Sequence, residues 1–281
     1  LADRYLGTRK AVIFGGILLV LGHLGMAVEG VKAQQAGADI VRDEGALWVF
    51  YFSLALIIMG VGFLKPNIST IVGRLYRDDD PRRDSGFSLF YAGINLGGVL
   101  AGLVCGYLGE TYGWRYGFGA AGIGMLAGLL MFLWGQKYLH GLAESPAPEK
   151  LRERLFLGLR REHAIYLGAF AGLAPIASLM WATANGALNL GGLPPALALM
   201  LLVMLGVMAW YVWFLVTQCS PVERRQMIAL MVLIVMALLF FTLYEQTYGS
   251  WVTFNDRLLT TDFFPGLILD QPLKFGSLMD T

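Results

Sequence analysis

Long apolar runs alternate with short polar segments along nearly the whole chain. Each run is about as long as the roughly 20 residues that a helix needs to cross the hydrocarbon core of a bilayer. The pattern therefore predicts seven membrane-spanning helices. Their expected bounds are residues 11–30, 47–73, 85–109, 115–139, 163–185, 195–217 and 226–252.

Composition supports an all-α membrane protein. Of the 281 residues, 57% are hydrophobic and only 15% are charged, whereas soluble domains carry about 25% charged residues. This balance excludes a secreted disulfide scaffold, a disordered chain and a nucleic-acid binder. The two cysteines, Cys105 and Cys219, lie far apart and form no CxxC motif, so the sequence predicts no metal site and no cofactor.

Glycine is abundant in the apolar runs and recurs at helical spacing in two of them. Gly98, Gly102 and Gly106 form one stripe, and Gly124 and Gly128 form a GxxxG pair. Small residues at this spacing allow close helix approach in membranes. We therefore expect both stripes to serve helix packing.

Basic residues are distributed unevenly between the two sets of loops. Fifteen of the 21 lysines and arginines fall on one side, and five fall on the other. The positive-inside rule predicts that the rich side is cytoplasmic. The chain is then expected to start inside the cell and to end outside. Leu1 follows no signal peptide, and both ends read as segments of a longer protein.

The longest polar stretch between spans covers residues 140–162. It contains Pro146 and Pro148 and alternates glutamate with arginine, as a cytoplasmic linker between two membrane units does. Four of its charged residues suit a short interfacial helix: Glu149, Arg152, Glu153 and Arg154. A solvated linker is the favoured interpretation of this stretch, and a regulatory site is the alternative.

Lys65 is an ionisable residue inside a predicted span. Such residues cost about 2.5–3.5 kcal/mol on insertion scales and mark functional sites. Pro66 removes the hydrogen bond to the Gly62 carbonyl, and such a break is tolerated where the backbone lines a cavity. Lys65 is therefore expected beside a helix break in an internal polar cavity. The alternative is a lysine that extends to the cytoplasmic interface.

Glu245 and His23 are the other ionisable residues within predicted spans. A carboxyl group at Glu245 can bind and release a proton as its surroundings change. The alternative places Glu245 at the outer interface, because Tyr248 and Trp251 resemble an aromatic belt. His23 either relays protons or bonds a neighbouring helix, and the second role is the commoner one.

Tyr91 and Asn95 lie one helical turn apart, with Gly98 on the same face. An amide and a phenol next to glycine can hydrogen-bond a polar substrate at close range. Alternatively, Asn95 only joins two helices, a contribution of about 0.6 kcal/mol on average. The residues alone do not decide between these roles.

Four segments resemble known transporters. Residues 3–10, Asp-Arg-Tyr-Leu-Gly-Thr-Arg-Lys, resemble the cytoplasmic loop between the second and third helices of the major facilitator superfamily. Residues 62–69, residues 90–97 and Tyr244-Glu245-Gln246 are similar to motifs of the fourth, fifth and seventh helices of the proton-dependent oligopeptide transporter family. Spans 163–185 and 195–217 match the helical hairpin that bacterial members insert between their two bundles.

The resemblance implies a symporter that imports di- and tripeptides on the proton gradient by alternating access. It implies that Lys65 engages the peptide carboxylate or its acidic partner, that Asn95 and Tyr91 contact the peptide, and that Glu245 cycles the coupling proton. Asp3, Arg4 and Arg9 would help to gate the cytoplasmic side. The expected partners are small peptides, protons and the lipid bilayer, and the expected protein is a monomer of the inner (plasma) membrane.

The same resemblance divides the chain into three parts. Residues 1–139 correspond to helices three to six of a truncated major facilitator bundle, residues 140–225 to the linker and inserted hairpin, and residues 226–281 to helix seven and the following outer loop. The first-helix motif of two glutamates and an arginine has no counterpart here, and neither do helices eight to twelve. The segment alone is therefore not expected to transport.

Two departures from this interpretation stay open. One is a transporter of another small solute with the same fold, such as nitrate or a drug. The other is a non-transporting membrane scaffold. An enzyme is disfavoured, because the sequence contains no HExxH motif, no GxSxG motif and no intramembrane aspartate pair.

The chain also departs from the family pattern near Glu245. Where family members often carry tryptophan four residues before that glutamate, this chain has Phe241.

Overall fold

A computed structural model describes residues 2–28, 30, 34–36, 39–77, 79–155, 158–186 and 192–246. The helices among them are, in chain order, a π-helical turn η1 (Ala2–Leu6), α1 (Thr8–Met26), α2 (Glu44–Arg74), α3 (Arg83–Tyr112), α4 (Trp114–Gly135), a 3₁₀ turn η2 (Gln136–Leu139), α5 (Pro148–Arg152), α6 (Arg161–Ala184), α7 (Pro195–Thr217) and α8 (Pro221–Glu245).

The predicted all-α membrane architecture is confirmed. Within the described residues, seven helices are long and apolar enough to cross a membrane, and each overlaps one predicted span. The largest differences are at the ends. The first helix covers Thr8–Met26 instead of 11–30, and the last begins at Pro221 and ends at Glu245. Residues 247–252 of the predicted last span lie outside the described residues.

Local capping explains why three helices begin earlier than predicted. Gly7 has a φ of 81°, a conformation that glycine adopts readily, and it separates η1 from α1. Asp43 caps α2 by accepting a hydrogen bond from the Ala46 amide (3.1 Å). Ser220 and Glu223 form a reciprocal capping box at the start of α8. Apolar periodicity does not reveal these polar first turns.

Two short strands lie between α1 and α2 and were not predicted. β1 (Gln34–Ala36) pairs antiparallel with β2 (Asp39–Val41), with Gln35 opposite Ile40. Three-residue strands are too short to show the alternation that identifies a strand in a sequence. The loop that joins the first two spans is therefore partly a small hairpin.

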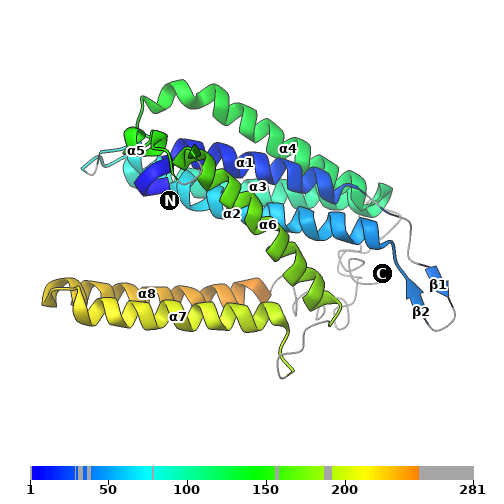
Figure 1. Cartoon of the computed structure of the whole chain (residues 1–281). Coiled ribbons are helices and arrows are strands. Elements are labelled where there is room, and N and C mark those ends of the chain that lie inside the picture. The colour runs from blue at the N-terminus through cyan, green and yellow to red at the C-terminus, as the bar shows by residue number, and fades with distance from the viewer. Residues whose placement is uncertain are drawn as a thin grey trace, which may run out of the picture. The chain divides into compact units, whose positions relative to one another are not determined.

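The chain divides into two compact units, residues 1–196 and residues 197–281. In the first unit α1 packs against both α2 and α4, α3 packs mainly against α4, and α6 packs against α2, an arrangement that can be followed in Figure 1. The second unit contains the pair α7 and α8, which run antiparallel. There the Tyr211 hydroxyl donates to the Met227 carbonyl (2.7 Å).

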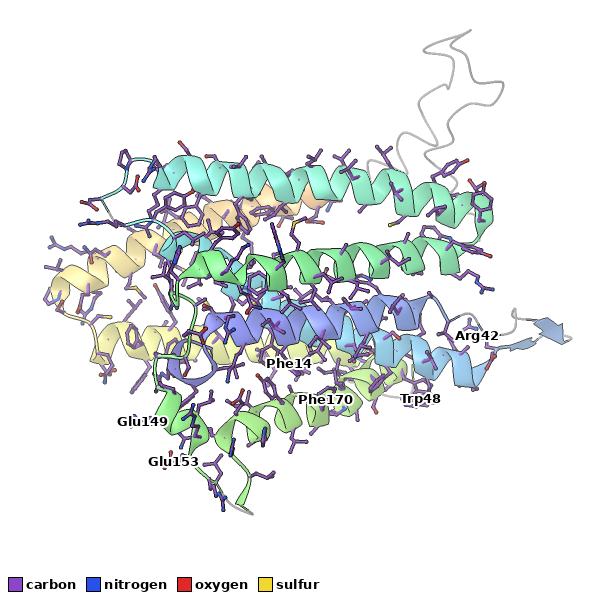
Figure 2. All side chains as sticks on the ribbon, turned by 90° about the horizontal axis from the view of Figure 1, so that it is seen from above. Phe14, Arg42, Trp48, Glu149, Glu153 and Phe170 are labelled. Carbon is purple, nitrogen blue, oxygen red and sulfur yellow. The ribbon has the colours of Figure 1, made fainter. Side chains whose placement is uncertain are left out.

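An aromatic cluster centred on Phe14 joins α1, α2 and α6. The Phe14 ring lies 5.0 Å from the Phe63 ring, 4.7 Å from the Tyr166 ring and 5.8 Å from the Phe170 ring, measured between centroids. Figure 2 shows Phe14 and Phe170 side by side between these helices. Edge-to-face aromatic pairs add to the energy of burial, so α6 is a firmly packed part of the first unit.

Glycine packing occurs where the sequence did not predict it. A Cβ atom on Gly98, Gly102, Gly106, Gly124 or Gly128 would meet nothing within 4 Å among the described residues, so the two predicted stripes do not pack in this structure. A close helix approach occurs instead between α1 and α2. A Cβ on Gly15 would lie 2.7 Å from the Gly60 carbonyl oxygen. Gly15 and Gly60 share no GxxxG spacing because they belong to different helices.

Replacing Gly60 by alanine is expected to destabilise the α1–α2 contact. The new methyl group would lie 2.9 Å from the Gly15 carbonyl oxygen and 3.0 Å from the Leu19 amide nitrogen, so the two helices must separate. Overpacking of this kind costs about 1–3 kcal/mol. We expect the thermal unfolding midpoint of the detergent-solubilised chain to fall by several degrees.

Gly62→Ala is the matched control, because Gly62 lies on the same helix and a Cβ atom added there would meet nothing within 4 Å among the described residues. Alanine in a helix interior is more favourable than glycine, so this variant is expected to match or slightly exceed the wild-type midpoint. Equal midpoints for the Gly60 and Gly62 variants would contradict the close α1–α2 contact.

Candidate functional site

The helix that carries Lys65 does not break at the following proline. α2 runs from Glu44 to Arg74 with Pro66 inside it, so the predicted break is wrong. Polar side chains bond backbone carbonyls around the proline: the Asn67 amide donates to the Phe63 carbonyl (2.7 Å), and the Thr70 hydroxyl donates to the Pro66 carbonyl (2.9 Å). Neither bond goes to the Gly62 carbonyl, which Pro66 leaves without its helical amide donor.

Lys65 and Tyr91 line one groove between α2 and α3. The groove has a volume of about 730 Å³ and opens to the outside. Among the described residues Lys65 has no ion-pair partner, so its cation is available to a ligand in the groove. The predicted polar cavity around Lys65 thus takes the form of an open groove. The lining residues are Lys65, Ile68, Ser69, Phe87, Ser88, Phe90, Tyr91, Ala92 and Ile94.

Two further polar residues line the groove. Ser69 belongs to the polar segment after Lys65 that indicated a cavity, whereas Ser88 was not singled out from the sequence. Their signal is helical spacing. Ser69 lies four residues after Lys65, and Ser88 lies three residues before Tyr91, so each shares a helical face with a candidate residue. The Ser69 hydroxyl donates to the Pro66 carbonyl (3.1 Å), and its oxygen can still accept a hydrogen bond.

The composition of the groove suits a small amphipathic anion. One ammonium group, one phenol and two hydroxyls face apolar walls that include Phe87 and Phe90. A lysine forms strong charge-assisted hydrogen bonds with carboxylates, and pockets for small ligands combine apolar walls with a few polar groups. The groove can therefore hold a carboxylate that carries a hydrophobic side chain.

Asn95 lies on α3 one turn beyond Tyr91 and does not line this groove. Its side-chain amide donates to the Tyr91 carbonyl (2.8 Å), and the residue is exposed. The amide oxygen of Asn95 can still accept a hydrogen bond in this arrangement. The structure thus brings Lys65 and Tyr91 together, while Asn95 bonds its own helix.

Glu245 belongs to the other unit, where it is the last residue of α8 and is exposed. Aromatic side chains precede it. The Tyr244 ring stacks on the Phe240 ring with 6.2 Å between centroids, and it meets the Phe241 ring edge-on at 6.3 Å. The carboxyl group therefore follows an aromatic surface on the last turn of the helix.

The loop motif at the start of the chain contacts the linker that precedes α6. The Arg9 guanidinium pairs with Glu144 (2.8 Å) and donates to the Gln136 amide oxygen (2.8 Å). Lys10 pairs with Glu162 at 2.5 Å. Of the other two residues assigned to gating, Arg4 is exposed, and the side chain of Asp3 lies outside the described residues. Arg9 thus ties α1 to the linker.

The linker contains a shorter helix than the sequence predicted. α5 covers Pro148–Arg152 and so includes Glu149 and Arg152. Glu153 and Arg154 lie beyond its end, because Glu153 turns into an extended conformation with a ψ of 134°. Figure 2 shows Glu149 and Glu153 at the edge of the unit near the first turn of α6.

His23 is half-buried in the last turn of α1. Its Nδ1 atom is shielded from solvent and has no hydrogen-bond partner among the described residues. The expected bond from His23 to a neighbouring helix is therefore not formed at this atom in the part of the chain that the structure describes.

Comparison with known proteins decides the family. The sequence profile of the POT family matches residues 9–265, which include the groove, the linker and Glu245. The chain belongs to the POT family. POT proteins are transporters, and the resemblance drawn from the motifs around Lys65, Tyr91 and Glu245 is thereby confirmed.

Curated POT relatives are longer than this chain. The peptide transporter YePEPT of Yersinia enterocolitica is 32% identical over 266 residues, which cover 91% of this chain and 48% of the relative. The di-/tripeptide transporter of Lactobacillus helveticus is 41% identical over 149 residues, which cover 50% of this chain and 27% of the relative. The chain spans half or less of these proteins.

The fold also matches solved POT structures. The crystal structure of a POT family transporter in complex with a thioalcohol-conjugated peptide is 27% identical, with a TM-score of 0.65. The match covers 91% of this chain and 48% of that one. Together with the seven apolar helices among the described residues, it supports a multi-pass membrane protein.

Proposed function

We propose that the whole protein is a symporter that imports di- and tripeptides together with protons by alternating access. The observation that carries the proposal is the groove in which Lys65 and Tyr91 meet, between apolar walls, in a POT family chain. Support comes from relatives that are named as peptide and di-/tripeptide transporters and from a related structure solved with a conjugated peptide.

Each polar residue of the groove has a role in this proposal. The Lys65 ammonium would donate to the peptide carboxylate, and the Tyr91 phenol would hydrogen-bond the peptide backbone. Phe87 and Phe90 would contact the hydrophobic side chain. Asn95 would reach the peptide through its amide oxygen, because its amide nitrogen already donates to the Tyr91 carbonyl. A dipeptide zwitterion requires a cation at one end and an acid at the other.

Proton coupling would depend on Glu245. A carboxyl group within or at the edge of a spanning helix can exchange a proton as its exposure and its cationic neighbours change. In the proposed cycle Glu245 is protonated on the outer side, where proton activity is higher, and releases the proton to the cytoplasm. No cofactor other than the proton takes part.

The proposed domain organisation rests on the family resemblance, and the proposed orientation rests on the charge pattern. Residues 1–139 would form part of the N-terminal bundle, residues 140–225 the linker and inserted hairpin, and residues 226–281 the start of the C-terminal bundle. Loops with fifteen basic residues against five support a cytoplasmic start in the plasma (inner) membrane. Arg9, with Arg4 and Asp3, would take part in cytoplasmic gating in a monomeric transporter.

Uptake of labelled dipeptide into proteoliposomes tests the proposed function. The whole protein, reconstituted with an imposed inward proton gradient, is expected to accumulate dipeptide above the external concentration. Dissipation of the gradient with a protonophore is expected to stop accumulation. Nitrate and cationic drugs serve as comparison solutes. Gradient-driven uptake of one of those solutes without dipeptide uptake would replace the peptide assignment with the other solute.

A further inference from the structure

The linker contains a small hairpin immediately before α6. Arg154 and Arg160 form an antiparallel β-bridge, flanked by hydrogen bonds from the Leu155 amide to the Leu159 carbonyl (2.8 Å) and from the Arg161 amide to the Glu153 carbonyl (2.9 Å). In this pattern the two arginines are a non-hydrogen-bonded pair, with Cα atoms about 4.5 Å apart and side chains on the same face.

Like charges directly opposite each other destabilise a β pair. Arg154 and Arg160 are both exposed, and neither has an ion-pair partner in the described part of the chain. Arg161, the next residue, differs because it pairs with Glu153 at 2.8 Å. Two adjacent guanidinium groups therefore present uncompensated positive charge, which an anion between them would offset.

Apolar side chains occupy the next position of each arm, one residue nearer the turn and on the opposite face of the hairpin. Leu155 is 39% exposed and Leu159 is 38% exposed, and each is the sequence neighbour of one of the arginines. Basic residues next to exposed leucines are the composition of segments that lie at membrane interfaces. Free phosphate would use only the arginines, whereas a lipid surface would use both residue types.

The hairpin lies next to a candidate membrane span. α6, a candidate membrane span, begins at Arg161, so Arg160 immediately precedes a helix that enters the bilayer. At the end of the preceding span, the Lys137 ammonium lies over the Trp134 ring (4.8 Å) and the Tyr138 ring (5.0 Å). Aromatic residues of this kind mark membrane–water interfaces.

The linker is also held at this level by contacts with the start of α1. Leu151 of α5 is 3% exposed and packs in a core with Leu6 and Ala11. Tyr5 lies under the Arg161 guanidinium at 4.9 Å, and its carbonyl accepts a hydrogen bond from the Ser145 hydroxyl. The base of the hairpin is thus fixed, while the arginine pair faces outward.

We infer that the Arg154–Arg160 hairpin binds the anionic phosphodiester headgroups of the adjacent bilayer leaflet, with Leu155 and Leu159 entering the apolar edge of that leaflet. Each basic residue near an anionic membrane surface contributes about a factor of five to binding. The pair therefore favours immersion of the hairpin by about twenty-fivefold in an anionic membrane over a neutral one. This inference is independent of the transported solute.

A spin label at position 159 tests the immersion of the hairpin. The whole protein carries L159C in a background in which Cys105 and Cys219 are replaced by serine. It is reconstituted in vesicles of phosphatidylcholine alone or of phosphatidylcholine with phosphatidylglycerol. Collision rates with oxygen and with a water-soluble nickel chelate report the depth of the label. We expect a deeper label in the vesicles that contain phosphatidylglycerol.

Neutral variants connect the effect to the arginine pair. R154Q/R160Q is expected to abolish the difference between the two vesicle types. R77Q/R225Q, which removes the same charge elsewhere, is expected to retain it. Because the lipid comparison uses one protein, it does not depend on how the variants fold. Equal label depth in both vesicle types would overturn the inference. Deeper immersion of the label after inorganic phosphate is added to phosphatidylcholine vesicles would also overturn the inference, because Arg154 and Arg160 would then bind soluble phosphate.

Discussion

Replacing Lys65 by alanine is expected to reduce the kcat/KM of dipeptide uptake by about tenfold to a hundredfold. A hydrogen bond to a charged group contributes about 1.5–3 kcal/mol, and Lys65 is the only cationic residue lining the groove that the structure describes. The measurement is initial uptake by the whole protein in proteoliposomes, corrected for the amount of inserted protein.

Two variants separate a binding role for Lys65 from an interfacial one. Lys65→Arg keeps the charge and is expected to retain part of the activity. Lys137 extends over Trp134 at the end of its span, so Lys137→Ala removes a lysine of the interfacial kind and is expected to leave uptake unchanged. If Lys65→Ala transported at the wild-type rate, Lys65 would be an interfacial lysine as well.

Replacing Glu245 by glutamine is expected to abolish accumulation of dipeptide against its gradient while exchange of peptide across the membrane continues. Glutamine keeps the size and hydrogen-bonding capacity of the side chain but cannot bind a proton. The proton then no longer couples to the conformational cycle. Counterflow of labelled dipeptide into vesicles loaded with unlabelled dipeptide measures exchange without a proton gradient.

Glu110→Gln is the matched control for this prediction. Glu110 is an exposed glutamate in the last turns of α3 and has no proposed role in coupling. Both activities are expected to be normal in that variant. Uphill accumulation by Glu245→Gln at the wild-type level would remove Glu245 from the coupling mechanism, and loss of exchange together with accumulation would indicate a structural role.

The spans were predictable because each depends on local composition. About 20 apolar residues in succession identify a membrane helix wherever its neighbours lie, and each of the seven predicted runs overlaps a helix among the described residues. Their ends were less accurate, because an end is set by individual residues such as Asp43 or the Ser220–Glu223 box. The strands at Gln34–Ala36 and Asp39–Val41 are too short to leave a pattern.

Packing could not be predicted, because it depends on which helices are neighbours. Gly15 of α1 and Gly60 of α2 lie in close contact, although neither sequence segment indicates which helix will pack against it. The glycine stripe that includes Gly102 shows strong periodicity yet meets no described neighbour. Periodicity shows that one face of a helix carries small side chains, and the fold decides whether another helix packs against that face.

The candidate site was predictable only in part for the same reason. Lys65 stood out because a charge inside an apolar run has a high insertion cost. Its placement beside Tyr91 depends on how α2 and α3 pack. Ser88 is an ordinary residue in the sequence, and only the groove shows that it lies near Lys65 and Tyr91. The hydrogen bond from Asn95 to its own helix was likewise not visible.

The uninterrupted course of α2 through Pro66 has a mechanical consequence. Proline supplies no amide hydrogen to the carbonyl of Gly62 four residues earlier, and Gly62 has open space where a side chain would stand. The helix can therefore bend at this level without losing a further backbone hydrogen bond. Lys65 immediately precedes the bend. A small rotation of the helical segment that ends at Arg74 would therefore move the Lys65 ammonium group relative to Tyr91. In the proposed transporter, this bend would weaken the contacts of Lys65 and Tyr91 with a bound peptide without unfolding a helical turn.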